Sequence, residues 1–588
     1  MSAGEPEPAR SRTAWIPVAV LVAALVAAAT PLATTWTIAG QSSLIELVRV
    51  QAFHAALAAG DLWPVWLPDL YARHGSPLPL YYAPLSYLPV ELARAAGLCA
   101  TGAIHLAFAL LWATGAAGAA WAARAWFGPG AGAAAAATYA LSPYFVADVY
   151  VRAGLAEVAA LAVLPWALGA LTRTGRRAFA GGALAVAALV LCHNISALIG
   201  VPLLAAVALF AGRELRRRGL AMIAVGVVLA TFFWWPALAG RGDVHAEESL
   251  TGGHFDYRRH FLRAERLLPG RTAVTLATAV GPRRPVRVGE LIWAGLLAAP
   301  IVARGADRQA RRRVAILALS GALTLAMTTA LSAPVWEALP LLRFVQFPFR
   351  WLLLATLVGS LLVGFLARRL PTGRRPLAVA AATALALLLV RPLLEPRYAF
   401  VERSTLAPVF TRADGLERAA ADPGLLAPGS AFGIDALRSR PVTGTSAHDF
   451  LPRRVARPPL AATRAAEPLA PGLEVLEAGW GYPEVRATVR VDAPAPLALH
   501  QFDFPGWRVD VDGERRAHRT EPGRGRIVVD LAPGDREVVA RFGWTARRAG
   551  AAAVSTATAL GLAIWLALGA RRRLRGAAEG PVDAGTGC

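Results

Sequence analysis

The chain has 588 residues, of which 56% are hydrophobic and only 17% are charged, and its long charge-free runs favour a membrane protein with many spans. The formal net charge of +22 comes entirely from arginine, because the sequence contains no lysine. These arginines stand mostly in short runs between apolar segments, which argues against a nucleic-acid-binding surface. The lysine-free, alanine- and glycine-rich composition is typical of a GC-rich bacterial genome.

The first apolar run covers residues 15–37 and predicts a membrane-spanning helix. Its apolar stretch of about 20 residues is longer than a signal-peptide core, so we expect it to be retained. Further apolar runs bring the predicted number of spans to about twelve. They lie at 101–123, 129–147, 154–172, 179–194, 196–211, 219–239, 287–303, 312–331, 349–367, 376–391 and 550–570.

Arginine clusters occupy both ends of the chain and every second loop between the predicted spans. The positive-inside rule then places the N- and C-termini in the cytoplasm and the remaining loops outside, in the inner (plasma) membrane of a bacterium. The clusters lie at residues 10–12, 124, 173–177, 213–218, 304–313, 368–375 and 571–575.

This alternation divides the chain into three parts. Residues 1–391 form a transmembrane domain with outer loops 38–100 and 240–286, and residues 550–588 form the last span and a cytoplasmic tail. Between them, residues 392–549 form an extracytoplasmic β-rich domain. Its second half alternates apolar and polar residues, as in EVRATVRVD and WRVDVDG, and turn signals such as Asp512-Gly513 separate the runs, so we predict a β-sandwich.

Polar residues gather on the predicted outer side of the membrane domain. The stretch DVYVRAGLAE, at 148–157, places two acids and an arginine among apolar residues. Charged groups at membrane depth are costly and usually line a cavity or pathway, so we predict one site reached from outside. Its candidate residues are Glu46, Arg49, Asp61, Asp69, Asp148, Tyr150, Arg152, Glu157, His193, Asn194, Gln346 and Arg350.

Several of these residues also have a purely structural interpretation. Asp148 and Arg152 could form an ion pair that orients a loop. His193 and Asn194 could complete the end of a broken helix, and Arg350 could extend to lipid headgroups. The three cysteines, Cys99, Cys192 and Cys588, suggest neither a disulfide framework nor a zinc site.

Six segments in order resemble a known group of proteins. They are GDLWPVWLPDLYARHGSPLPLYYAPLSYLP in the first outer loop, DVYVRAGLAE, CHNISAL, LRFVQFPFRWLLL, GTSAHDFLPRRV and DFPGWRVDVDG. Together they resemble the bacterial polytopic membrane proteins called "6-pyruvoyl-tetrahydropterin synthase-related", which are similar in turn to the GT-C superfamily of membrane glycosyltransferases. Pterin chemistry is not expected, because the ten histidines contain nothing like a three-histidine zinc site.

The resemblance implies a GT-C-like fold and a lipid-phosphate sugar donor, with a catalytic acid in the first outer loop. The sequence departs from that pattern in one place. SSLIELVRVQAF has Ser42 where an acid is expected, and Glu46 is the nearest carboxylate. Glu46 and Arg49 are three residues apart and would share one face of a helix.

We therefore predict a glycosyltransferase that moves a sugar from a polyprenyl phosphate to a glycan or lipid acceptor at the outer face. Glu46 or Asp148 would be the catalytic carboxylate, and the other charged and polar residues would bind substrate. Asp61 and Asp69 are candidate ligands for a divalent cation such as Mg²⁺ or Mn²⁺. The alternatives are a non-catalytic protein of the same fold that handles glycan or lipid, and a transporter.

Overall fold

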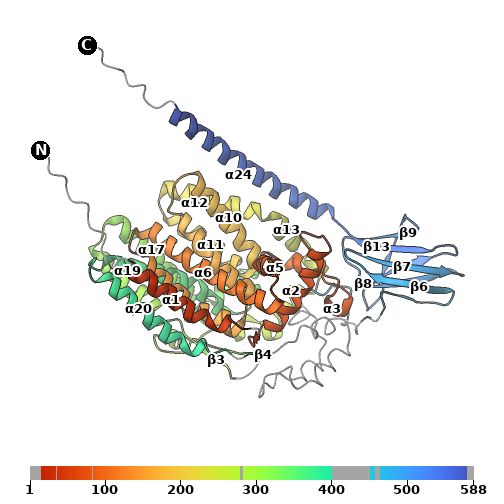
Figure 1. The fold of residues 1–588 in the computed structure, drawn as a ribbon, viewed down its shortest axis with the longest axis horizontal. Coiled ribbons are helices and arrows are strands. Elements are labelled where there is room, and N and C mark those ends of the chain that lie inside the picture. Colours follow the sequence, from red (N-terminus) through yellow and green to blue (C-terminus); the bar gives the residue numbers. More distant parts are fainter. Residues whose placement is uncertain are drawn as a thin grey trace, which may run out of the picture.

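The computed structural model describes residues 15–578 with the exception of 35, 83, 279–281, 397, 400–449, 457–461 and 463. A bundle of helices forms most of the molecule, and two β-sheets stand at one end of it (Figure 1). The last helix, α24, starts beside the sheets and runs back along the bundle.

Each of the twelve apolar segments contains helix. Two are broken: Leu141 and Ser142 separate two helices in 129–147, and Ala230 separates two in 219–239. The helices are α1 (Ile16–Ala29), α6 (Ala100–Phe127), α7 (Gly132–Ala140), α8 (Pro143–Ala147), α9 (Leu155–Ala170), α10 (Arg176–Cys192), α11 (Asn194–Phe210), α12 (Arg213–Leu229), α13 (Thr231–Ala239), α16 (Glu290–Val302), α17 (Arg308–Ala326), α19 (Leu352–Arg369), α20 (Arg375–Val390) and α24 (Ala546–Ala578).

Among the described residues, four helices are long and apolar enough to cross a membrane, or five if the pair α12–α13, bent by 67°, forms one span. The protein is therefore a membrane protein, while the count of twelve spans stays a prediction. The four differ in burial: 89% of the most apolar window within Pro348–Arg369 is buried inside the molecule, against 11% for Ala546–Arg571. The first lies at the centre of the bundle and the second on its periphery.

Small residues allow α6 and α9 to approach closely. A Cβ atom added at Gly118 of α6 would come within 2.6 Å of the Trp166 side chain, and one at Gly169 of α9 within 2.4 Å of the Trp121 side chain. Because lipid gives no hydrophobic drive for helices to associate, such close packing is a main source of helix–helix affinity in a membrane.

The arginine-rich loops meet at the end of the bundle away from the sheets (Figure 1). Arg313 donates to the carbonyl of Trp126, Arg368 to that of Pro129 at 3.2 Å, and Arg369 to that of Gly305 at 3.3 Å. These loops were predicted to share one side of the membrane, and the fold brings them together. Which side that is stays a prediction.

Shorter elements lie in the predicted outer segments and between the helices. Those around the first outer loop are β1 (Thr37–Ile38), α2 (Ser43–Ala58), α3 (Leu70–Arg73), α4 (Leu78–Tyr81), η2 (Pro84–Tyr87) and α5 (Leu88–Ala95). A further short element, η3 (Asp148–Arg152), lies between α8 and α9. Later in the chain are η4 (Arg241–Asp243), α14 (Ala246–Thr251), η5 (Gly253–Phe255), η6 (Tyr257–Arg259), α15 (Ala264–Leu267), β2 (Val274–Leu276), β3 (Arg284–Val286), α18 (Ala333–Ala338), η9 (Pro340–Val345), η10 (Pro348–Trp351) and β4 (Tyr398–Ala399), which pairs with β1.

The C-terminal strands form two antiparallel sheets, in the orders β10-β9-β13-β7-β6 and β11-β12-β8-β5. Apolar residues of β7 alternate inward, and the Asp512-Gly513 turn joins β9 to β10, as predicted. The strands are β5 (Ala466–Pro468), β6 (Leu473–Trp480), β7 (Glu484–Val491), β8 (Ala495–Phe502), β9 (Trp507–Val511), β10 (Glu514–Arg516), β11 (Arg519–Thr520), β12 (Arg526–Leu531) and β13 (Glu537–Phe542). The predicted segment 400–449 lies outside the described residues.

Strand β8 is buried on both faces, because the first outer loop covers the face turned away from the strands. Trp66 Nε1 donates to Gln501 Oε1 at 2.7 Å, and the amide of Phe502 donates to the His74 carbonyl at 2.7 Å. The His74 ring also stacks on His500, with ring centroids 5.5 Å apart. The first outer loop is thus one of the segments that join the β-region to the helical bundle.

Candidate functional site

The segment DVYVRAGLAE interrupts the helix between α8 and α9. Residues 148–152 form one turn of π-helix, and Ala153 then adopts a left-handed conformation with φ +50°. Both features are uncommon and are frequent at functional sites, since they are kept only where the surrounding structure holds them. The turn directs Asp148, Arg152 and Glu157 toward one another.

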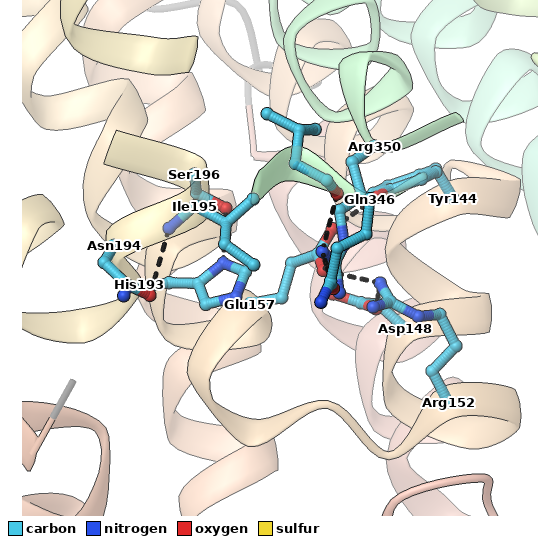
Figure 2. A network of polar contacts seen from close by, with 11 residues as sticks. Tyr144, Asp148, Arg152, Glu157, His193, Asn194, Ile195, Ser196, Gln346 and Arg350 are labelled. Carbon is cyan, nitrogen blue, oxygen red and sulfur yellow. Dashed lines mark hydrogen bonds and ion pairs between the residues drawn. The ribbon is translucent and has the colours of Figure 1, made fainter. Parts of the chain in front are cut away.

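Arg152 bridges the two acids (Figure 2). Its Nη1 donates to Asp148 Oδ1 and to Glu157 Oε2, the second at 2.6 Å. The hydroxyl of Tyr144 donates to the other oxygen of Glu157. Asp148 is 0% exposed and Glu157 2%, so the ion pair is buried inside the protein.

Arg350 approaches the same group from another part of the chain. Its Nε lies 3.6 Å from Glu157 Oε2, and its Nη1 donates to the Val345 carbonyl at 2.8 Å and to Gln346 Oε1 at 3.0 Å. Gln346 has φ +66°, a conformation that costs a non-glycine residue of order 1–3 kcal/mol. Arg350 therefore points inward and does not extend to headgroups.

His193 and Asn194 stand where α10 ends and α11 begins. His193 Nδ1 lies 2.7 Å from Ser196 Oγ, and Asn194 Nδ2 donates to the Tyr81 carbonyl at 3.1 Å. Asn194 Oδ1 also accepts from the Ile195 amide at 3.1 Å, at the start of α11, whereas the His193 side chain makes no capping hydrogen bond to α11 in the described structure. The structural interpretation therefore fits Asn194. His193 also lies within electrostatic range of Glu157, which joins it to the charged group (Figure 2).

The start of α2 is hydrogen-bonded to the π-helical turn. The amide of Gln41 donates to the Val151 carbonyl at 3.0 Å, and that of Ser42 to the Arg152 carbonyl at 2.8 Å. These bonds bring Glu46 beside the cluster, where it is 3% exposed. Burial raises the pKa of Glu46, and the charge of Arg49 opposes that rise.

A small cavity opens beside Glu46. It is lined by Thr37, Ile38, Ser43, Glu46, Leu47, Thr101, Ile104, His105, Phe108 and Ala153. The Oε2 atom of Glu46 is buried and has no hydrogen-bond partner among the residues that the structure describes, and the same is true of Asp148 Oδ2. Burying an acceptor without a donor costs free energy. A ligand hydroxyl that donates to either oxygen would remove this cost, so these two oxygens are favourable positions for binding a hydroxyl.

Tyr82 connects the Glu46 side of the site with the Arg350 side. The guanidinium of Arg49 lies over its ring, 4.5 Å from the centroid, and its ring meets that of His193 at 6.4 Å. Burial and the charge of Glu46 raise the pKa of Tyr82 to about 12, while Arg49 and Arg350 lower it. Its hydroxyl therefore stays protonated at neutral pH and can donate.

The buried charges balance: Glu46, Asp148 and Glu157 face Arg49, Arg152 and Arg350. Removing ions from water costs several kcal/mol each, and only close pairing with good hydrogen bonds compensates. The fold meets this cost with groups from α2, η3, α9 and η10. Such an arrangement can bind an anion at an arginine and accept a proton at a carboxylate.

Three predicted site residues lie elsewhere. Tyr150 points away from the charged group, donating its hydroxyl to the Ala28 carbonyl at 2.5 Å and packing on Trp112. Asp61 accepts from the Tyr482 hydroxyl at 2.8 Å and from the Trp63 amide at 3.0 Å, so its carboxylate belongs to the contact between outer loop and β-region. Asp69 precedes α3, and burial raises its pKa.

One residue of the site, Tyr144, was missing from the residues that the sequence indicated. Tyr144 lies 13 positions from Glu157, a spacing that no helix face would bring together without the break at η3. Tyr82 belongs to the tyrosine-rich end of the outer loop, and the sequence indicated the tyrosines there as residues that stack on sugar or line a lipid groove.

No protein-family model matches the chain, and no curated protein matches it in sequence. Solved structures similar to it include the arabinofuranosyltransferase AftD from Mycobacteria, with a TM-score of 0.42 and 19% identity over 65% of this chain. A mutant of AftD gives 0.45 and 19% over 71%. ArnT from Cupriavidus metallidurans, bound to undecaprenyl phosphate, gives 0.37 and 18% over 70% of each chain. The chain spans 26% of the AftD chain in the first comparison and 30% in the second.

Proposed function

We propose that the protein is a membrane glycosyltransferase that moves a sugar from a polyprenyl-phosphate donor to a glycan or lipid acceptor at the outer face. One observation carries the proposal. Two buried carboxylate oxygens without partners, on Glu46 and Asp148, lie in the same buried group as three arginines. The transfer requires a proton acceptor beside a site for a phosphate, and this group supplies both.

Glu46 is the proposed general base. The acceptor hydroxyl attacks the anomeric carbon of the sugar, a new C–O bond forms, and its proton passes to Glu46 Oε2. The bond between that carbon and the donor phosphate breaks at the same time, and the electron pair leaves on the phosphate oxygen. Asp148 is the second candidate base, since its Oδ2 is equally without a donor.

Arg350 and Arg49 are the proposed phosphate-binding groups. Charge-assisted hydrogen bonds from arginine stabilise the leaving phosphate more than neutral donors do. Arg350 Nε makes no hydrogen bond within the described residues, whereas Arg152 is held by two carboxylates. The structure thus favours a positioning role for Arg152, which keeps Asp148 and Glu157 in place.

Asp61 and Asp69, the candidate ligands for a divalent cation, lie apart from the buried charged group. Both oxygens of Asp61 already accept hydrogen bonds, and the described part of the chain contains no group of three histidine, cysteine, aspartate or glutamate side chains that could hold a metal ion. We derive no step through a metal.

A second candidate is a non-catalytic protein that binds lipid or glycan. The close pairing of Arg152 with Asp148 and Glu157 favours it, because a closed ion-pair network of this kind also occurs as a purely structural element.

The test is transfer of radiolabelled sugar from a panel of polyprenyl-phosphate donors by the purified full chain in lipid. We expect Glu46→Gln to lower kcat by at least about 100-fold, since general base catalysis contributes 10²–10⁴. Asp148→Asn runs beside it.

Glu91→Gln is the matched control, because Glu91 is also a buried glutamate of the outer loop, paired with His54 at 2.7 Å but outside the site. It should transfer sugar at the wild-type rate. Binding of polyprenyl phosphate without transfer from any donor would support the non-catalytic candidate instead. Full activity in both acid variants would exclude these two carboxylates as the base.

A further inference from the structure

The side chain of Gln346 is bonded at both ends of its amide. Oε1 accepts from Arg350 Nη1 at 3.0 Å, and Nε2 donates to the Leu250 carbonyl at 3.1 Å. A guanidinium can only donate and a carbonyl can only accept, so these partners fix which way the amide points. The residue is 5% exposed. Both polar atoms of its side chain are therefore hydrogen-bonded within the protein, whereas a residue that binds substrate needs a polar atom that can bond to the substrate.

The backbone at Gln346 adopts a conformation that is unfavourable for a residue other than glycine. Its φ of +66° persists only where neighbours enforce it, and the two side-chain bonds are such neighbours. The next residue, Phe347, lies under the Arg350 guanidinium and contacts the ring of His260 at 4.8 Å. Residues between 246 and 260 therefore contact the turn that carries Arg350 and hold it in place.

Leu250 belongs to a segment that is bonded at its other end to the β-region. We call residues 243–251 the outer strap. The amide of His245 donates to the Leu451 carbonyl, and that of Arg453 to the Asp243 carbonyl, both at 2.9 Å. His245 Nε2 also donates to the Val455 carbonyl at 3.2 Å.

Residues 451–456 in turn join the second sheet. The amide of Ala456 donates to the Gly523 carbonyl at 2.9 Å, and Val455 packs against Gly525. A continuous set of hydrogen bonds therefore runs from the β-region through the outer strap to Gln346, and from there to Arg350.

We propose that Gln346 is a positioning residue: one end of its amide holds Arg350 toward Glu157, and the other end holds the outer strap, which is docked on the β-region. Arg350 points inward while Gln346 Oε1 accepts from it, and the bond from Gln346 Nε2 to the Leu250 carbonyl helps to hold the strap. The consequence for sugar transfer rests on the proposed function, whereas the link between Gln346 and the strap does not.

Two substitutions separate the two bonds. Gln346→Glu keeps an acceptor for Arg350 but cannot donate to the Leu250 carbonyl, and Gln346→Leu loses both bonds. Hydrogen–deuterium exchange of the full chain in lipid would report on the amides of His245 and Arg453. We expect both variants to speed exchange there at least about tenfold, while the amides of β13 keep their wild-type rate.

Kinetics then test the link to Arg350. Gln346→Leu should raise the KM for the polyprenyl-phosphate donor about as much as Arg350→Gln does, and the double variant should be no worse than Arg350→Gln alone. Gln346→Glu should keep the donor KM within about threefold of wild type. A residue with only a structural role would fail equally in both variants.

Arg343→Gln is the matched control, because Arg343 ties the same segment through Glu247 at 2.8 Å without touching Arg350. It should speed strap exchange and leave the donor KM unchanged. Unchanged exchange at His245 and Arg453 in Gln346→Leu would overturn the proposal, as would an equal loss of donor affinity in both Gln346 variants. If the wild-type chain transfers no sugar, the proposed function fails while the exchange experiment still decides the link.

Discussion

Arg152 is the residue that holds two buried acids in one place. Its guanidinium donates to Asp148 and Glu157, and all three residues are buried, with exposed fractions of 9% for Arg152, 0% for Asp148 and 2% for Glu157. A buried charge that loses its partner is far more costly than an intact pair is favourable. Arg152 therefore contributes both to the stability of the protein and to the geometry of the proposed site.

Replacing Arg152 by glutamine should lower the free energy of unfolding by about 3–5 kcal/mol, because buried Asp148 loses the arginine paired with it and Glu157 keeps only the longer contact with Arg350 Nε, at 3.6 Å. Thermal melting of the purified chain in detergent would measure it. Arg486→Gln, on the exposed face of β7 beside Glu484, is the comparison and should change stability by less than about 1 kcal/mol. Equal losses in the two variants would contradict the role given to burial.

Tyr144 makes a smaller contribution of the same kind. Tyr144→Phe removes the donor to Glu157 Oε1 and should cost about 1–3 kcal/mol in the same measurement. Tyr257→Phe keeps the stacking of that ring on Trp336, 4.9 Å away, and should cost less than about 0.5 kcal/mol. A loss at Tyr257 as large as that at Tyr144 would show that the hydroxyl of Tyr144 contributes nothing specific.

At the scale of elements, strand β8 and the outer loop form a pH-sensitive contact. His500 Nε2 accepts from Arg526 Nη1 at 2.6 Å, and Glu467 lies 3.5 Å from the same nitrogen. Glu521 binds Arg526 on its other side, and His74 stacks on the ring from the outer loop. Burial, and then the charge of Arg526, lower the pKa of His500.

Because the folded pKa of His500 lies below the unfolded value of about 6.5, the unfolded state takes up a proton first as the pH falls. Stability of the docked β-region should therefore be complete above about pH 6.5 and decline below it. Hydrogen exchange in β8 between pH 7.5 and 5 would measure the decline. His500→Gln should flatten it, while His518→Gln should not, and a wild-type profile that is flat over this range would contradict the assignment.

The sequence predicted these elements unevenly. Apolar runs located helix in every predicted span, and the Asp512-Gly513 turn and the alternation in β7 located strands, because local composition decides those features. It also placed Asp148, Arg152 and Glu157 together, since they are close in the chain. The contacts Tyr144–Glu157 and Trp66–Gln501 could not be predicted, because one depends on the π-helical turn and the other joins residues 435 positions apart.

At the scale of the whole molecule, the arginine-rich loops and the sheets lie at opposite ends, which makes the predicted orientation testable. Cys99 is exposed near the start of α6, on the predicted outer side, and Cys192 is buried. In a Cys588→Ala background, a membrane-impermeant maleimide should label Cys99 in intact spheroplasts.

A cysteine in the loop between α19 and α20 gives the opposite expectation. Gly373 has open space around it, so Gly373→Cys should fold normally. Combined with Cys99→Ala, it should be labelled only after the spheroplasts are lysed. Labelling of Gly373→Cys in intact spheroplasts would show that the orientation is the reverse of the predicted one.

The hydrogen bond between Trp66 and Gln501 has a consequence for how the protein is made. The outer loop leaves the ribosome 435 residues before its partner on β8. At about 5–20 residues per second, that separation corresponds to roughly 20–90 s of synthesis. Throughout this time the Trp66 indole and the apolar side of the loop have no strand to cover them. The nascent chain therefore exposes an apolar aromatic surface until the strands are made, and during that time the surface must be shielded by other components of the cell.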